Sequence, residues 1–149
     1  MTTTLPQPGR QSVYQLSDNL RDVTRVFGGE GEREELLLSK LGPRGWGRLH
    51  HFRHYYSAGW GSGLGKPLSP RALETFYRFL EAARFPARSV PSVFLTDDGC
   101  IEVCWEDSDG KAVQLEFGPA EIEFYVEAQQ LEDSVPASEA KAVARRLTA

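Results

Sequence analysis

The sequence predicts an α+β fold in which N-terminal helices pack on one face of a three- to four-stranded antiparallel β-meander, followed by a short C-terminal helix. Apolar residues recur three to four positions apart in the first half of the chain. From residue 101 onwards they alternate with polar residues, and turn residues separate the alternating segments. The length of 149 residues and the 40% hydrophobic content suit one domain with one core.

Three segments are expected along the chain. Residues 1–12 are polar and include two prolines and a glycine, which predicts a disordered leader. Residues 13–134 are expected to form the single α+β domain. Residues 135–149 are alanine-rich and predict a helical tail, in which Arg145 and Arg146 lie near the C-terminal end, where the helix dipole favours positive charge.

Helical spacing of apolar residues predicts three short helices in the N-terminal half. They cover residues 12–27, 30–41 and 46–56, and Gly42 with Pro43 breaks the pattern between the last two. These helices supply part of the layer that a one-sided sheet needs as its cover.

The most clearly marked helix runs from Ser69 to about residue 84. Ser69 is a favourable N-cap, and Pro70 suits the first helical position. Leu73, Phe76 and Leu80 then repeat at helical spacing on one face. We expect this face to cover the sheet, with Phe76 and Leu80 buried against it.

Strict alternation of apolar and polar residues marks the strands. It predicts strands over residues 101–106, 113–117 and 121–127, and residues 92–95 are a candidate fourth strand. Asp-Gly and Gly-Pro pairs between these segments favour tight turns. The expected result is an antiparallel meander with one apolar face and one polar face.

Charge is strongly segregated along the chain. Residues 1–89 hold 13 basic and 8 acidic residues, whereas residues 90–134 hold 12 acidic residues and one base, Lys111. Alternation places many of these acids on the polar face, which we expect to dock on a basic protein partner such as a toxin or a nucleic-acid-binding protein. A surface that is merely solvated is the alternative. The candidate partner-binding acids are Glu102, Glu106, Glu116, Glu121, Glu123 and Glu127.

The glycine-rich run at residues 59–73 carries a resemblance to a known family. It reads Gly-Trp-Gly-Ser-Gly-Leu-Gly-Lys-Pro-Leu-Ser-Pro-Arg-Ala-Leu, and an amphipathic helix and an acidic Ile-Glu-Val-Cys-Trp-Glu strand follow it. Residues 58–127 resemble a family of small uncharacterised bacterial and phage-borne proteins with a Gly-Trp-(Asp/Asn)-Gly-x-Gly-Ala-x-Pro-x-Ser loop. Gly61 stands where Asp or Asn is usual. The resemblance implies an accessory protein of a mobile element, of the antitoxin or inhibitor kind, and Trp60 of this loop joins the candidate partner-binding residues.

A phosphate-binding loop is disfavoured by the spacing around Gly65 and Lys66. The first glycine of G-x-x-x-x-G-K would fall on Trp60, and Pro67 stands where a Ser or Thr should bind magnesium. We therefore expect a connector rather than a nucleotide site, and no cofactor.

A zinc site of two histidines and two cysteines is also disfavoured. His50 and His54 share a helix face, and Cys100 and Cys104 share a strand face. However, there is no C-x-x-C pair, and no Glu follows the first histidine as in H-E-x-x-H. We expect no metal, and we expect the two cysteines to be free thiols in a reducing compartment.

The alternative function is nucleic-acid binding or regulation through residues 44–66. This region interleaves Arg and His with Trp, Phe and Tyr, which suits phosphate contact and base stacking. Helical spacing makes the aromatics candidates for the core instead, and a net charge of −4 opposes a polyanion, so direct binding of nucleic acid is the less favoured expectation.

Catalysis and membrane insertion have no recognisable signal. There is no G-x-S-x-G motif and no cysteine beside an expected base, so we expect no enzyme. No apolar run approaches the roughly 18 to 20 residues that span a bilayer, and the start lacks the order of a signal peptide. We expect a cytoplasmic protein.

Overall fold

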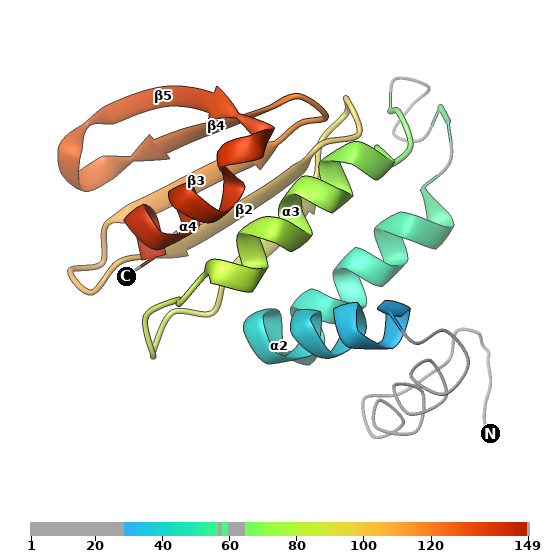
Figure 1. The fold of residues 1–149 in the computed structure, drawn as a ribbon, viewed down its shortest axis with the longest axis horizontal. Coiled ribbons are helices and arrows are strands. Elements are labelled where there is room, and N and C mark those ends of the chain that lie inside the picture. Colours follow the sequence, from blue (N-terminus) through green and yellow to red (C-terminus); the bar gives the residue numbers. More distant parts are fainter. Residues whose placement is uncertain (1–28, 57, 60–64, 149) are drawn as a thin grey trace.

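The structure, a computed structural model, describes residues 29–56, 58–59 and 65–148. It consists of a five-stranded antiparallel sheet with helices on one face, which confirms the expected α+β class (Figure 1). The expected leader at residues 1–12 and the expected helix at residues 12–27 lie outside the described residues. The elements are α2 (Gly29–Tyr55), α3 (Pro70–Ala82), β1 (Ser92–Leu95), β2 (Ile101–Glu106), β3 (Ala112–Phe117), β4 (Glu121–Val126), β5 (Leu131–Pro136) and α4 (Ala140–Thr148), with 3₁₀ turns at Glu127–Gln129 and Ala137–Glu139.

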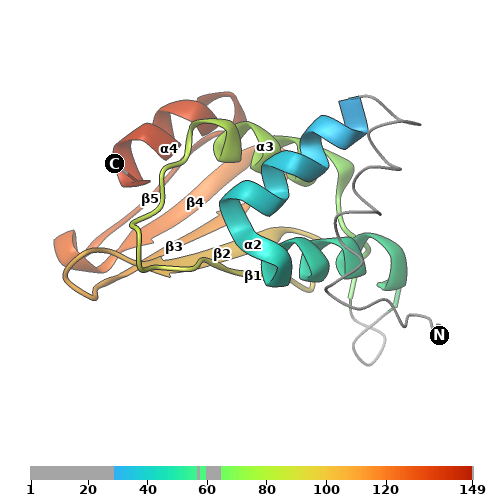
Figure 2. The same ribbon diagram turned by 90° about the horizontal axis from the view of Figure 1, so that it is seen from below.

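Helix α2 is two helices joined at a kink. Gly42 has φ 76° and ψ 175°, values that no helix accommodates, and Pro43 follows it. The expected break at this position is confirmed. The second half of α2 runs alongside the edge strand β1 (Figure 2), and it places Leu49 and Phe52 in the core.

Helix α3 covers the sheet as its sequence predicts. The Ser69 hydroxyl oxygen accepts a hydrogen bond from the Ala72 N–H at 3.2 Å, and Pro70 occupies the first turn. Phe76 and Leu80 are fully buried, and the Phe76 ring lies 5.2 Å from the ring of Phe117 on β3. The predicted burial of Phe76 and Leu80 is confirmed.

The sheet has the order β1-β2-β3-β4-β5, so it holds five strands where three to four were expected. Strand β5 was missed because its sequence does not alternate. Leu131, Asp133 and Val135 share the inner side, and the acidic Asp133 interrupts the apolar pattern. Pairing with β4 holds this edge strand, and the half-buried Leu131 and Val135 pack against the core.

The C-terminal helix is present as α4, and it belongs to the core. Ala140, Val143 and Ala144 are buried on its inner side, and α4 lies against α3. The Thr148 hydroxyl oxygen accepts a hydrogen bond from the Arg84 backbone N–H at 2.8 Å, which ties the ends of the two helices together. Strand β5 extends across the boundary expected at residue 134, so residues 135–149 begin inside the sheet.

Candidate functional site

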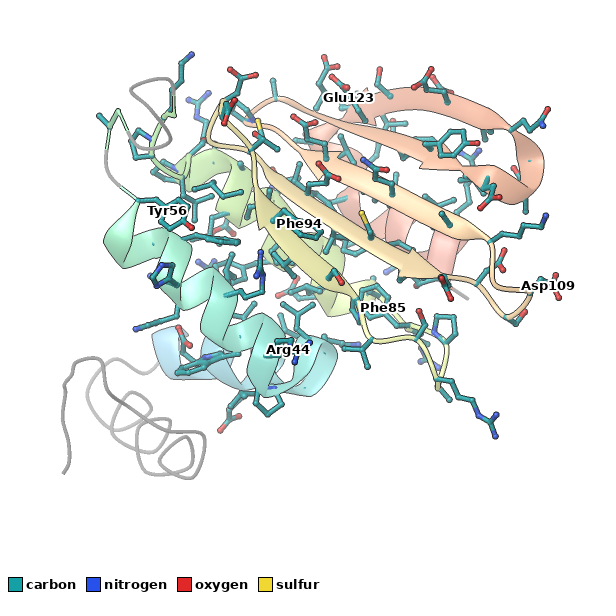
Figure 3. All side chains as sticks on the ribbon, turned by 180° about the vertical axis from the view of Figure 1, so that it is seen from behind. Arg44, Tyr56, Phe85, Phe94, Asp109 and Glu123 are labelled. Atoms are coloured by element: carbon teal, nitrogen blue, oxygen red, sulfur yellow. The ribbon has the colours of Figure 1, made fainter. Side chains whose placement is uncertain are left out.

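The polar side of the sheet faces away from the helices, and we call it the outer face (Figure 3). Alternation puts every second residue of β2, β3 and β4 on it, while the intervening residues are buried in the core. The outer face therefore collects residues that three consecutive strands supply. These are Glu102, Cys104, Glu106, Ala112, Gln114, Glu116, Glu121, Glu123 and Tyr125.

Three carboxylates form a row across the outer face, one residue from the end of the β2–β3 pairing. Glu102 is paired directly with Glu116 on the neighbouring strand, and Glu116 is paired with Glu123 on the next. We call Glu102, Glu116 and Glu123 the acidic row. Like charges directly opposite one another in a sheet are destabilising, by about 0.2 to 1 kcal/mol per pair. Folding alone does not account for such a row.

Glu116, at the centre of the acidic row, responds to this crowding. Partial burial raises its pKa, and the Glu123 carboxylate raises it further; Glu102 and Asp98 add smaller effects in the same direction. A hydrogen bond from the Cys100 thiol opposes these effects in part. Burial and the neighbouring carboxylates therefore both disfavour the charged form of Glu116, and an approaching cation would favour it.

No base neutralises these acids among the residues that the structure describes. The ion pairs within that part of the chain lie in the helix layer, which consists of α2, α3 and α4, and none includes any of the six candidate glutamates. Besides Glu116, two of the six accept hydrogen bonds within the sheet. Glu102 accepts a hydrogen bond from the Gln114 side chain at 2.8 Å, and Glu127 accepts one from the Ala112 N–H at 2.7 Å, which fixes the start of β3.

Beside the acidic row, the outer face is hollowed where β3, β4 and β5 meet. The hollow has a volume of about 510 Å³ and is open to solvent. Tyr125 is 37% exposed at this hollow, and Phe94, 41% exposed, lies opposite Glu102 at the other end of the row. Sequence analysis missed Phe94 and Tyr125, although alternation already places both on the same side as the glutamates. The residues around the hollow include Gln114, Glu116, Glu121, Glu123, Tyr125, Glu132 and Ser134.

The two cysteines lie beside the acidic row as free thiols. Burial, reinforced by the Glu102 carboxylate, raises the pKa of Cys104 to about 11. Burial and the Glu116 carboxylate raise the pKa of Cys100 as well. Since the thiolate is the nucleophilic form, the raised pKa lowers the nucleophilicity of both cysteines at neutral pH.

The zinc site of two histidines and two cysteines, which the sequence disfavours, is not formed in the described part of the chain. His50 stacks on Trp46 in the helix layer, with ring centroids 5.3 Å apart, and the side chain of His54 lies outside the described residues. No group of three or more His, Cys, Asp or Glu side chains arranged for a metal is found among the residues described. In the same part of the chain, no helix is both long and apolar enough to cross a membrane.

Residues 44–66, the basis of the alternative function, are partly used inside the fold. Phe52 is buried, the Arg48 guanidinium donates to the Val93 carbonyl at 2.7 Å, and Arg53 pairs with Glu34 at 3.3 Å. Trp60 lies outside the described residues.

Comparison of the chain with protein-family models, with curated proteins and with solved structures finds no match. The resemblance of residues 58–127 to the family of small bacterial and phage-borne proteins therefore stays a prediction.

Proposed function

We propose that this chain is a non-catalytic protein-binding module that docks the outer face of its sheet on a basic surface of a partner protein. The acidic row carries the proposal. Glu102, Glu116 and Glu123 oppose one another directly across three strands, and no described base neutralises them. An arrangement that disfavours the isolated fold but complements a cation belongs to a surface used for recognition.

The surroundings of the acidic row support a protein surface as the ligand. Phe94 and Tyr125 add exposed aromatic area on the same face, and aromatic residues are enriched at the centres of protein interfaces. A field of one sign speeds the approach of a partner of opposite charge, and salt weakens it. A toxin or a nucleic-acid-binding protein presents the basic surface that this face fits, so we propose an antitoxin-like or inhibitor role in a mobile element.

Two observations favour this proposal over the other functions. The raised pKa values of Cys100 and Cys104 leave both thiols protonated, which supports a non-catalytic role. Phe52 and Arg53 are engaged inside the fold, so fewer side chains of residues 44–66 remain for nucleic acid.

The experiment reverses the charge of the acidic row. The partner is captured with the tagged chain at low salt and purified, and its association rate is measured as salt rises. We expect the triple variant E102K/E116K/E123K to stay folded and to bind about tenfold more weakly or worse, chiefly through slower association. The wild-type rate should fall in the same way at high salt.

A matched control separates the position of the charges from their number. The variant E35K/D109K/E139K changes net charge equally at exposed positions away from the acidic row. It should retain most of the affinity. If the acidic-row variant folds and keeps its affinity, the docking proposal is wrong.

A further inference from the structure

A groove follows the seam between helix α2 and the connection from α3 to β1, residues 83–91. It consists of two hollows of about 210 and 280 Å³, and they adjoin because Val90 and Pro91 line both. We call these two hollows the seam groove. In Figure 3, Arg44 lies on the helix side of the seam and Phe85 on the side of the connection.

Exposed apolar surface is concentrated in the seam groove. Within the described part of the chain, the exposed large hydrophobic residues are Val90 at 72%, Phe94 at 41% and Tyr125 at 37%, and the first two line the same hollow. The half-buried Phe85 lines the other hollow. Single exposed apolar residues are ordinary on a protein surface, but a cluster in a concave site indicates binding.

The seam groove continues into a basic hollow. This third hollow has a volume of about 400 Å³ and shares Lys40 and Arg84 with the 280 Å³ hollow. Along the three hollows the described lining residues include six bases and a single acid, Glu81. The bases are Lys40, Arg44, Arg48, Arg84, Lys141 and Arg145.

Half of these bases hold the walls of the groove together. Lys40 donates to the Ala83 carbonyl at 2.5 Å, Arg48 to the Val93 carbonyl at 2.7 Å, and Lys141 pairs with Glu81 at 3.3 Å. These contacts join α2 to the end of α3 and to β1, and join α4 to α3. Half of the bases thus contribute to the contacts between the elements that line the groove.

The other three bases, Arg44, Arg84 and Arg145, are exposed, and their guanidinium groups make no hydrogen bond or ion pair with any residue described. At least one of them lines each hollow. The C-termini of the first half of α2 and of α3 lie here too, each equivalent to about −0.5 charge. Two helix ends offset only part of the charge of six bases, so the groove stays positive.

We propose that the seam groove and the basic hollow bind an extended acidic peptide segment of a partner protein, in which apolar residues alternate with carboxylates. The carboxylates of the peptide complement the positive charge of the groove, because the three exposed arginines can bind them in bidentate fashion. Its apolar residues fit the hollows that Val90, Phe94 and Phe85 line. A single-stranded nucleic acid fits less well, because it needs a series of exposed aromatic rings for stacking. The Phe94 ring, which lines the groove, already has the Arg48 guanidinium 5.1 Å from its centroid, so one of its faces is occupied.

The test uses the full chain and three fluorescent probes of equal length. They are a ten-residue peptide of alternating Glu and Leu, a peptide of alternating Glu and Ser, and a ten-nucleotide oligothymidine. We expect the Glu-Leu peptide to bind about tenfold more tightly than the Glu-Ser peptide, because only leucine fills the apolar hollows. The variant R44Q/R84Q/R145Q should bind it about tenfold more weakly or worse.

Two further variants keep the result interpretable. The control R71Q/R78Q/K111Q removes the same charge from exposed positions outside the groove and should bind as the wild type does. V90E places a carboxylate where the two hollows meet and should lose the Glu-Leu peptide, although Val90 has no part in the core. Equal binding of both peptides, tighter binding of oligothymidine, or no binding of any probe would each overturn the proposal.

Discussion

The helix layer and the outer face of the sheet arrange charge in opposite ways. In the helix layer, acids meet bases: Arg33 pairs with Glu74 at 2.8 Å and Lys141 with Glu81 at 3.3 Å. On the outer face, acidic residues are paired directly with acidic residues of the neighbouring strand, and the acidic row lies across three strands. Both surfaces belong to one small fold, so the general acidity of the chain does not explain the contrast.

The difference indicates which carboxylates serve folding and which serve recognition. A paired charge contributes locally whether or not a partner is present. A row of like charges destabilises the isolated fold, and its electrostatic energy becomes favourable only when a cation binds. Substitutions in the two regions should therefore separate stability from binding.

The largest effect is expected where the helix layer meets the inner face of the sheet. Phe76 is fully buried against Phe117, so Phe76→Ala should lower the free energy of unfolding by about 3 to 5 kcal/mol. The matched change on the outer face, Tyr125→Ala, should cost less than about 1 kcal/mol, because Tyr125 is 37% exposed. Urea denaturation of both variants measures the difference. Equal losses would mean that the outer face also carries fold stability.

An intermediate effect is expected at a carboxylate inside the helix layer. Glu34 is 5% exposed, accepts a hydrogen bond from the Trp46 indole N–H, and pairs with Arg53 at 3.3 Å. Glu34→Ala should lower the free energy of unfolding by about 2 to 4 kcal/mol, because a buried donor and a guanidinium lose this acceptor. Its exposed neighbour gives the control: Glu35→Ala should change stability by less than about 0.5 kcal/mol. Thermal unfolding measures both variants. Similar decreases in melting temperature for Glu34→Ala and Glu35→Ala would mean that a paired carboxylate contributes no more to stability than an exposed one.

Sequence analysis predicted the elements whose signals are local. Helix α3 carries its own cap at Ser69 and its own apolar stripe through Phe76, and the break in α2 follows from Gly42 and Pro43. The acidic outer face followed from alternation alone, because a strand sends successive side chains to opposite sides. These features do not depend on which segments come together.

Features that depend on tertiary pairing were not predicted. Strand β5 forms because it pairs with the edge of β4, and Asp133 interrupts the alternation of apolar and polar residues by which a strand is recognised in a sequence. The direct opposition of Glu102, Glu116 and Glu123 depends on strand register, which composition does not specify. Glu34 shares a helix face with Leu37 and Leu41, and this helical phase is the signal that could have marked it as buried.

The smallest effect, and the sharpest test of the contrast, is expected at Glu116. Its pKa is raised in the folded protein by burial and by Glu123, so the folded chain binds a proton more tightly than the unfolded chain does. Stability must then fall as pH rises between the unfolded and the folded pKa. Glu116→Gln removes this dependence. We expect the variant to be more stable than the wild type by about 0.2 to 1 kcal/mol at pH 7, with the difference vanishing as the pH falls below the unfolded pKa.

Urea denaturation of the wild type and of E116Q from pH 4 to pH 8 measures this difference, and E121Q is the control. Glu121 is exposed at the end of β4 opposite Pro136, so its substitution should change the free energy of unfolding only slightly. A less stable E116Q at pH 7 would mean that the carboxylate holds the sheet together, for instance through its bond with Cys100. A more stable E116Q that also binds the partner more weakly would show the acidic row working against folding and in favour of recognition, because one substitution would move the two quantities in opposite directions.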